Sequence, residues 1–126
     1  PKRKYTFPPA DRISEIQEII KKHCDDRNWT QFHGAKNLAI ALICEASEVL
    51  EPLRFKSEKE IEEMMSNKDF KKSIGEEMAD VLYFLLRLSQ KYDIDISSAF
   101  EEKMKKNELK YPIDRAKGSN KKYTEF

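Results

Sequence analysis

Two short acidic phrases that nearly repeat each other constrain the fold of this chain most strongly. Residues 45–50 are Glu-Ala-Ser-Glu-Val-Leu, and residues 77–82 are Glu-Met-Ala-Asp-Val-Leu. Residues three apart are neighbours on one helix face, so each phrase predicts a helix with two carboxylates side by side. Apolar residues such as Leu42 and Phe84 share those faces. The pattern therefore predicts two helices that pack together and bring four acids to one interface.

The four acids are Glu45, Glu48, Glu77 and Asp80, and two interpretations of them stay open. Carboxylates inside apolar packing are costly unless a cation neutralises them. Hard oxygen ligands suit Mg²⁺ or Mn²⁺, which also bind the phosphates of a substrate. Alternatively, the acids belong to solvated helix faces, as most such pairs do. The repetition and the apolar flanks favour a divalent-metal site for phosphate chemistry.

The composition is typical of a helix-rich protein with one domain. The 126 residues are 37% charged and include only 3 Gly, and the net charge is +1. That charge gives no global field for nucleic acid or an acidic membrane, and the longest apolar runs are too short to span a bilayer. The first residues do not resemble a secretory signal. Because Cys24 and Cys44 form no paired motif, we expect free, buried thiols and a cytoplasmic protein.

Hydrophobic periodicity and capping residues predict an all-α fold, an antiparallel four-helix bundle with the two acidic helices at its centre. The stretch from Leu38 to Cys44 is apolar on all sides, which predicts a central, buried helix. We expect a basic extended arm at residues 1–10, one domain at residues 11–111 and an irregular basic tail at residues 112–126. The expected helices cover residues 11–26, 35–55, 58–66, 69–92 and 96–110.

Two further segments carry unusual side chains. The loop at residues 27–34 contains Trp29 and Phe32, which either plug into the core or line a ligand pocket. Lys103 and Asn107 are four residues apart on the inner stripe of the last helix. There the lysine either lays its stem on the core or, beside a metal site, meets a polyphosphate.

Other metal and phosphate sites lack their ligands in this sequence. A carboxylate-bridged di-iron bundle needs Glu-x-x-His motifs, and His23 and His33 do not stand in that relation to the acids. Zinc needs Cys or His clusters, and a P-loop needs the Walker spacing. Oxygen-only coordination, an aromatic loop and lysines together favour a nucleotide whose phosphates are held by Mg²⁺.

Several motifs resemble one family, the all-α nucleoside triphosphate pyrophosphatases, and within it the MazG-like dCTP pyrophosphatase branch. The similarity covers roughly residues 11–126. Its motifs are Trp29, Gln31-Phe32-His33, Asn37-Leu38, the pairs Glu45-x-x-Glu48 and Glu77-x-x-Asp80, Lys103-x-x-x-Asn107, Tyr111-Pro112 and the closing Lys122-Tyr123-Thr124-Glu125.

The resemblance implies hydrolysis of a (deoxy)nucleoside triphosphate, dCTP or a modified dCTP, to the monophosphate and pyrophosphate. It implies Mg²⁺, or Mn²⁺, bound by Glu45, Glu48, Glu77 and Asp80. It also implies catalytic roles for Glu45 and Glu48, with either Glu48 or Glu51 orienting the water. Nucleotide contacts would come from Trp29, Gln31, His33, Phe55, Phe84, Lys103, Asn107 and Tyr111. In this family, neighbouring subunits complete the active site, so we expect a homodimer or homotetramer.

The chain departs from the branch at three positions, and alternatives follow. Phe55 stands in place of Trp, Ile20 in place of a His near the base, and Pro52 in place of Leu. The first two changes put the preference for dCTP in doubt. The alternatives are an all-α dUTPase, a phosphoribosyl-ATP pyrophosphohydrolase, or a non-catalytic helical bundle that binds nucleotide.

Overall fold

The computed structural model describes residues 11–126, and the expected basic arm at residues 1–10 lies outside them. The described part is helical and contains no strand, which confirms the all-α prediction. Within it, no helix is long and apolar enough to cross a membrane. The α-helices are α1 (Asp11–Asp26), α2 (Ala35–Leu50), α3 (Glu58–Met65), α4 (Lys68–Lys91), α5 (Ile96–Lys110) and α6 (Ile113–Ala116), with the short 3-10 turns η1 (Thr30–Phe32), η2 (Glu51–Leu53) and η3 (Tyr123–Glu125).

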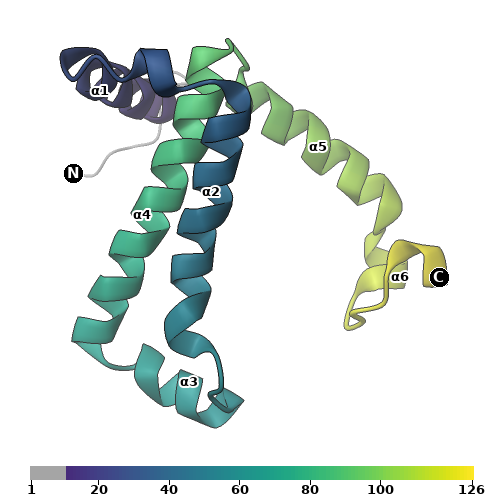
Figure 1. The fold of residues 1–126 in the computed structure, drawn as a ribbon. Helices are drawn as coiled ribbons and strands as arrows, with labels where there is room; N and C mark the ends of the chain where they lie inside the picture. The colour runs from purple at the N-terminus through teal and green to yellow at the C-terminus, as the bar shows by residue number, and fades with distance from the viewer. Residues whose placement is uncertain (1–10) are drawn as a thin grey trace, which may run out of the picture.

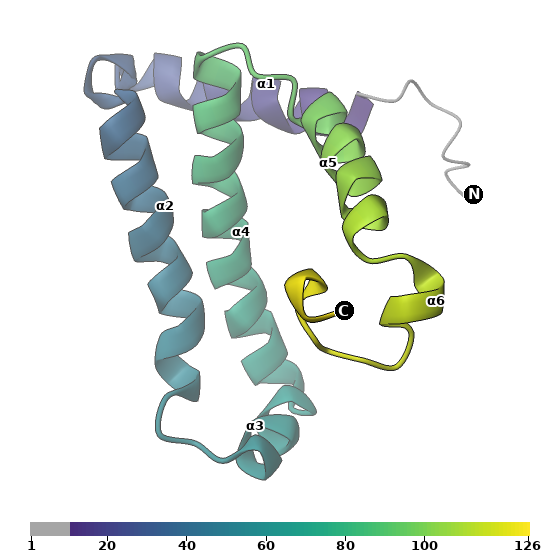
Figure 2. The ribbon, with the colours of Figure 1, turned by 90° about the vertical axis from the view of Figure 1, so that its right-hand side faces the viewer.

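Helices α2 and α4 form the central antiparallel pair, as the two acidic phrases predict (Figure 1). The short helix α3 connects them at one end, and α1 crosses the pair at the other end (Figure 2). The expected helix 35–55 ends earlier, at Leu50, and continues as η2. Pro52 accounts for the break, because its nitrogen cannot donate the next helical hydrogen bond.

Local signals in the sequence set the helix ends. Ser57 Oγ accepts from the backbone N–H of Glu60, and the side-chain carboxylate of Glu60 accepts from the backbone N–H of Ser57, so the predicted capping box of α3 is confirmed. Asp95 caps α5, also as expected. Helix α1 ends in a Schellman motif, in which Asn28 has a φ of 58° and the N–H of Trp29 donates to the carbonyl of Cys24 at 2.9 Å. This cap fixes the direction in which the next loop leaves α1.

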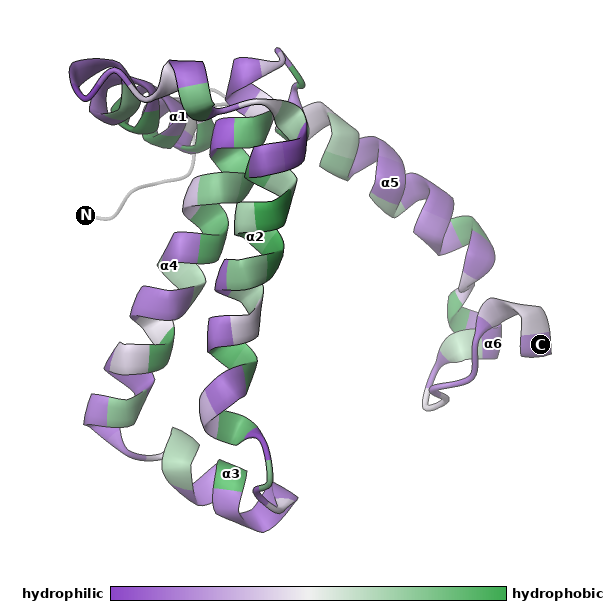
Figure 3. Cartoon of the chain, viewed as in Figure 1, coloured by the Kyte–Doolittle hydropathy of each residue, from purple (hydrophilic) through white to green (hydrophobic). Residues whose placement is uncertain are grey.

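The buried core is small and lies where α1 meets α4 and the start of α5. Its main cluster consists of Ile20, Cys24 and Leu86, with Ile96 packed against it, and Leu38 and Ile74 are also buried. By contrast, the expectation that Leu38 to Cys44 is buried on all sides is wrong for the single chain. Leu38 is buried, but Ile43 is 68% exposed and Cys44 is also exposed. Figure 3 shows the apolar residues continuing along the outer side of α2. These residues are exposed because no element of the described chain covers them.

Helix α5 begins beside α1 and α4 and then extends away from the central pair (Figures 1 and 2). The tail after it is more ordered than expected: α6 and η3 form one helical turn each. The ring of Tyr111 lies edge-on to Tyr123 and Phe126, with centroids 5.8 Å apart in both pairs. These aromatic contacts hold the tail against the end of α5. The sequence predicted an irregular tail instead, because this segment is polar and contains glycine.

Candidate functional site

A pocket of about 500 Å³ lies between α1, α2, α4 and the loop after α1. It brings together four residues that the sequence analysis selected, namely Trp29, Glu45, Asp80 and Phe84. The remaining lining residues are Ile19, Ile20, His23 and Tyr83. One part of the wall is therefore aromatic and apolar, and another part carries two carboxylates. Trp29 is 40% exposed, so it forms a wall of this pocket rather than a plug in the core.

The aromatic wall is built from rings that meet edge to face. His23 lies 5.5 Å from Trp29 and 5.9 Å from Tyr83, and Tyr83 lies 4.9 Å from Phe84, all measured between ring centroids. The hydroxyl of Tyr83 contacts Sγ of the buried Cys24 at 3.2 Å. Burial and this contact raise the pKa of Tyr83 to about 12, so its ring stays neutral. Such edge-to-face packing holds each ring in a defined orientation.

The four acids influence one another across the α2–α4 interface, although they are less buried than expected. Glu45 and Glu77 are half-buried, whereas Glu48 and Asp80 are exposed. Loss of hydration raises the pKa of Glu77 above its usual value, and the charges of the other three acids raise it further. The expectation of acids enclosed in apolar packing is thus wrong for the exposed pair, because α5 does not cover this interface in the single chain.

The donor set fits a hard divalent cation. All four groups are carboxylates, and they repel one another in a way that a cation relieves. Within residues 11–126, no three His, Cys, Asp or Glu side chains are close enough to form a preformed metal cluster. Mg²⁺ tolerates such an open arrangement, since it keeps several waters and uses only one or two carboxylates together with phosphate oxygens.

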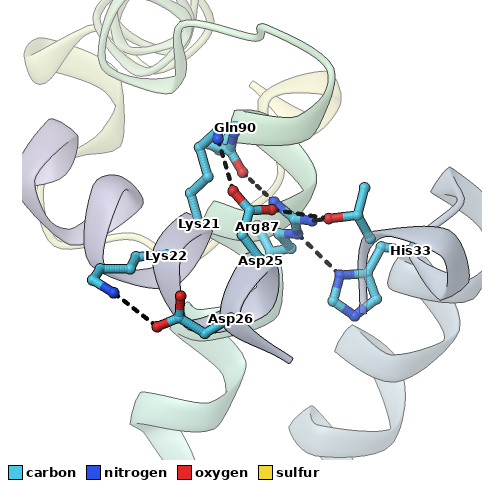
Figure 4. A network of polar contacts seen from close by, with 8 residues as sticks. Lys21, Lys22, Asp25, Asp26, His33, Arg87 and Gln90 are labelled. Atoms are coloured by element: carbon cyan, nitrogen blue, oxygen red, sulfur yellow. Dashed lines mark hydrogen bonds and ion pairs between the residues drawn. The ribbon is translucent and has the colours of Figure 1, made fainter. Parts of the chain in front are cut away.

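Arg87 was not selected from the sequence, and it holds the loop beside the pocket. Its side chain is 2% exposed, Nε donates to Nδ1 of His33 at 3.0 Å and Nη2 donates to Oγ1 of Thr30 at 2.9 Å (Figure 4). Nζ of Lys91 also donates to the backbone carbonyl of His33, at 2.7 Å. In this structure, His33 therefore contacts α4 and is not among the residues that line the pocket.

The other expected nucleotide contacts lie elsewhere in the single chain. Gln31 Nε2 donates to the carbonyl of Asn28 at 3.0 Å and so closes its own loop. Phe55 is 90% exposed beyond the far end of α2, which at 16 residues is about 24 Å long. Lys103, Asn107 and Tyr111 are on or just after α5, which extends away from the central pair of helices (Figure 1), and none of them lines the pocket. One chain alone does not bring these residues to the pocket.

The comparison with protein families gives one match that covers most of the chain. The model described as "MazG-like family" matches residues 40–126, which include both acidic phrases and the tail. The chain belongs to the MazG-like family.

Curated relatives of this MazG-like chain carry a consistent name. Proteins named dCTP pyrophosphatase 1 are 31% identical in Rattus norvegicus over 97% of this chain and 72% of the relative, and 30% identical in Homo sapiens over 98% and 72%. A crystal structure described as a pyrophosphatase, from Archaeoglobus fulgidus DSM 4304, superposes with a TM-score of 0.74 at 36% identity. The superposed part covers 80% of this chain and 93% of the Archaeoglobus fulgidus chain. The MazG-like resemblance and the fold are therefore confirmed.

Sequence reasoning on this MazG-like chain missed His23, which lines the pocket, and Arg87, which holds the loop beside it. His23 follows Ile16, Ile19 and Ile20 at helical spacing, so it could have been placed on the inner face of α1. Arg87 gave no such signal, because an arginine in a long charged helix is usually exposed. Only the fold shows that it is buried.

Proposed function

We propose that this MazG-like chain hydrolyses dCTP, or a modified dCTP, to the monophosphate and pyrophosphate with the help of Mg²⁺ or Mn²⁺. The enzyme class itself is confirmed: the chain is a nucleoside triphosphate pyrophosphatase, because its relatives are named dCTP pyrophosphatase 1 and the Archaeoglobus fulgidus structure is described as a pyrophosphatase. The base preference and the metal are proposed.

The shape of the pocket is the observation that carries the proposal. Trp29 and Phe84 provide ring faces, and base–aromatic stacking contributes about 1–3 kcal/mol per base. Glu45 and Asp80 lie on the same wall as part of the four-acid group. A nucleotide with its base against the rings would thus direct its phosphates toward the acids. That orientation suits hydrolysis at the triphosphate and leaves the base intact.

The acids would hold the metal and the attacking water. Glu45, Glu48, Glu77 and Asp80 are the proposed ligands, and Mg²⁺, when bound, supplies charge neutralisation and Lewis acidity toward the phosphates. The water needs a carboxylate oxygen that is not held by another protein side chain. Glu51 is paired with Nη1 of Arg54 at 3.1 Å, which supports Glu48 as the residue that orients the water.

A second copy of the chain would complete the site. An apolar hollow of about 590 Å³ between α2 and α4 is lined by Ala46, Val49, Gly75, Met78, Ala79, Val81, Leu82 and Leu85. Such an exposed apolar surface is typical of a protein interface. Phe55 and the α5 residues Lys103 and Asn107 do not line the pocket of their own chain. We therefore propose a homodimer or homotetramer in which these residues serve the pocket of a neighbour.

A substrate panel tests the proposed function. Canonical and modified deoxynucleoside and ribonucleoside triphosphates are assayed for pyrophosphate release with Mg²⁺ and then with EDTA. We expect fastest turnover for dCTP or a modified dCTP, and no turnover after chelation. Preference for dUTP or phosphoribosyl-ATP would instead identify one of the alternative enzymes. Nucleotide binding by calorimetry without any turnover would contradict the proposal.

The compartment is a separate proposal. Cys24 and Cys44 are both free thiols, which fits a reducing compartment such as the cytoplasm.

A further inference from the structure

The loop that carries Trp29 is fixed from two sides. On the α1 side, the N–H of Trp29 donates to the carbonyl of Cys24 at 2.9 Å. On the α4 side, Arg87 donates to Thr30, which directly follows Trp29, and to His33 at the end of η1 (Figure 4). The position of the indole ring in the pocket wall therefore depends on both contacts.

Arg87 is an unusual residue to find at this place. The residue is 2% exposed, and within residues 11–126 its guanidinium forms no ion pair with a carboxylate. Its acceptors are neutral: Thr30, His33 and Gln90. The nearest acid in the network is Asp25, which accepts from Oγ1 of Thr30 at 3.1 Å. Because burying a cation costs free energy, an apolar residue would stabilise the packing of α4 at lower cost.

The contacts of Arg87 also link the loop to the reacting end of the pocket. Asp80, Phe84 and Arg87 are all on α4, and seven residues of helix separate the first from the last by about 10 Å. A rigid helix thus sets the distance between Trp29 and the acids, through the bonds of Arg87 to the loop. The planar guanidinium suits this task, since it donates to several acceptors in a fixed geometry.

We propose that Arg87 is a positioning residue that holds the Trp29 loop against the pocket and thereby sets the affinity for the base of the nucleotide. The proposal rests on the proposed function, because it assumes that a base occupies the space beside Trp29. Arg87 does not touch the substrate; it acts through Thr30 and His33. Its loss should therefore weaken recognition of the base and leave the chemistry at the phosphates unchanged.

The first experiment measures the loop without any substrate. The chain contains one tryptophan, so its fluorescence reports on this loop alone. Thr30→Val removes an acceptor of Arg87 from the exposed loop, and Thr30→Ser keeps the hydroxyl as the matched control. We expect acrylamide to quench the emission of Thr30→Val and Arg87→Gln more strongly than that of the wild type, and Thr30→Ser to behave as the wild type. Unchanged quenching in both test variants would overturn the proposal.

The second experiment separates the base from the phosphates. We expect KM for the best nucleoside triphosphate to rise about tenfold in Thr30→Val while kcat stays within about twofold. Competitive inhibition by tripolyphosphate, which has no base, should not change. A fall in kcat at constant KM, or an equal loss of tripolyphosphate affinity, would refute positioning of the base. If the wild type turned over no nucleotide, the proposed function would fail, and quenching would still decide whether Arg87 holds the loop.

Discussion

Glu48 and Asp80 are the residues on which the proposed chemistry depends most directly. Both are exposed, and both contribute to the charge that raises the pKa of Glu77. We expect Glu48→Gln and Asp80→Asn each to lower kcat about a hundredfold or more, because each removes a metal ligand or a base without changing the shape of the side chain. Pyrophosphate release under saturating substrate is the measurement.

The same two variants should keep their helical circular dichroism signal, since neither side chain is buried. Glu62→Gln, an exposed acid on α3, is the matched control and should keep full activity. Full activity of Glu48→Gln and Asp80→Asn would contradict the metal site.

Glu77 gives a prediction that does not need turnover. Repulsion among the acids should make the metal-free chain less stable as the pH rises through the raised pKa of this group. A bound cation relieves that repulsion. Mg²⁺ at about ten times its Kd should therefore raise Tm by about 4 °C. The shift, measured by calorimetry, should shrink in Glu77→Gln, and an identical shift in both proteins would place the ion elsewhere.

The protonation state of His33 should make the stability of the folded chain depend on pH. Burial and the nearby charges of Arg87 and Lys91 hold its pKa below the usual 6.5, and its Nδ1 must be unprotonated to accept from Arg87. Between pH 6.5 and the lower folded value, the unfolded chain binds a proton that the folded chain does not. The free energy of unfolding should therefore fall as the pH is lowered through this window.

Urea denaturation at a series of pH values measures that fall. His33→Asn keeps an acceptor near Nδ1 but cannot titrate, so it should show a smaller pH dependence in this window. An unchanged dependence in His33→Asn would show that other groups cause it.

For single residues, the position predicted from the sequence matches the structure where that position depends only on the pattern within one helix. Glu45 and Asp80 were placed on facing helices from their spacing and their apolar neighbours, and the pocket contains both. His33 and Arg87 could not be paired in advance, because they are 54 residues apart and their bond depends on how the loop meets α4.

The conformation at the end of α1 determines the position of the loop that carries Trp29. Asn28 has a φ of 58°, a conformation that costs a residue with a Cβ and no local polar group about 1 kcal/mol. We expect Asn28→Ala to lower the free energy of unfolding by about 1 kcal/mol. Chemical denaturation measures the effect, and Asn28→Gly should keep wild-type stability or exceed it, because glycine adopts positive φ freely. If both variants lost the same free energy of unfolding, the side-chain amide of Asn28, and not its backbone conformation, would be the source of the stability.

The helices were largely predictable, because capping and periodicity are local. The capping box at Ser57 and the N-cap at Asp95 were both read from a few adjacent residues. The ordered conformation of the tail was not predictable from the sequence. It depends on contacts of the Tyr111 ring with Tyr123 and Phe126, which lie several residues further along the chain.

The whole molecule leaves too much apolar surface open for a single chain. Ile43 is 68% exposed and Met78 57% exposed, on the two central helices. We expect light scattering to give a mass that is a multiple of 14.9 kDa. Leu82→Arg puts a charge into the apolar hollow between α2 and α4, so it should reduce that mass to one chain, whereas Leu82→Met should not. A monomeric wild type with full activity would contradict the composite site.

The separation of Trp29 and Phe55 by the whole length of α2 has a genetic consequence. If every working pocket takes its stacking rings from two polypeptides, a lesion at Phe55 and a lesion at Asp80 damage different halves of it. A hybrid of one Phe55→Ala polypeptide and one Asp80→Asn polypeptide would then contain one pocket with both lesions and one with neither. Two inactive proteins, co-expressed, should complement each other.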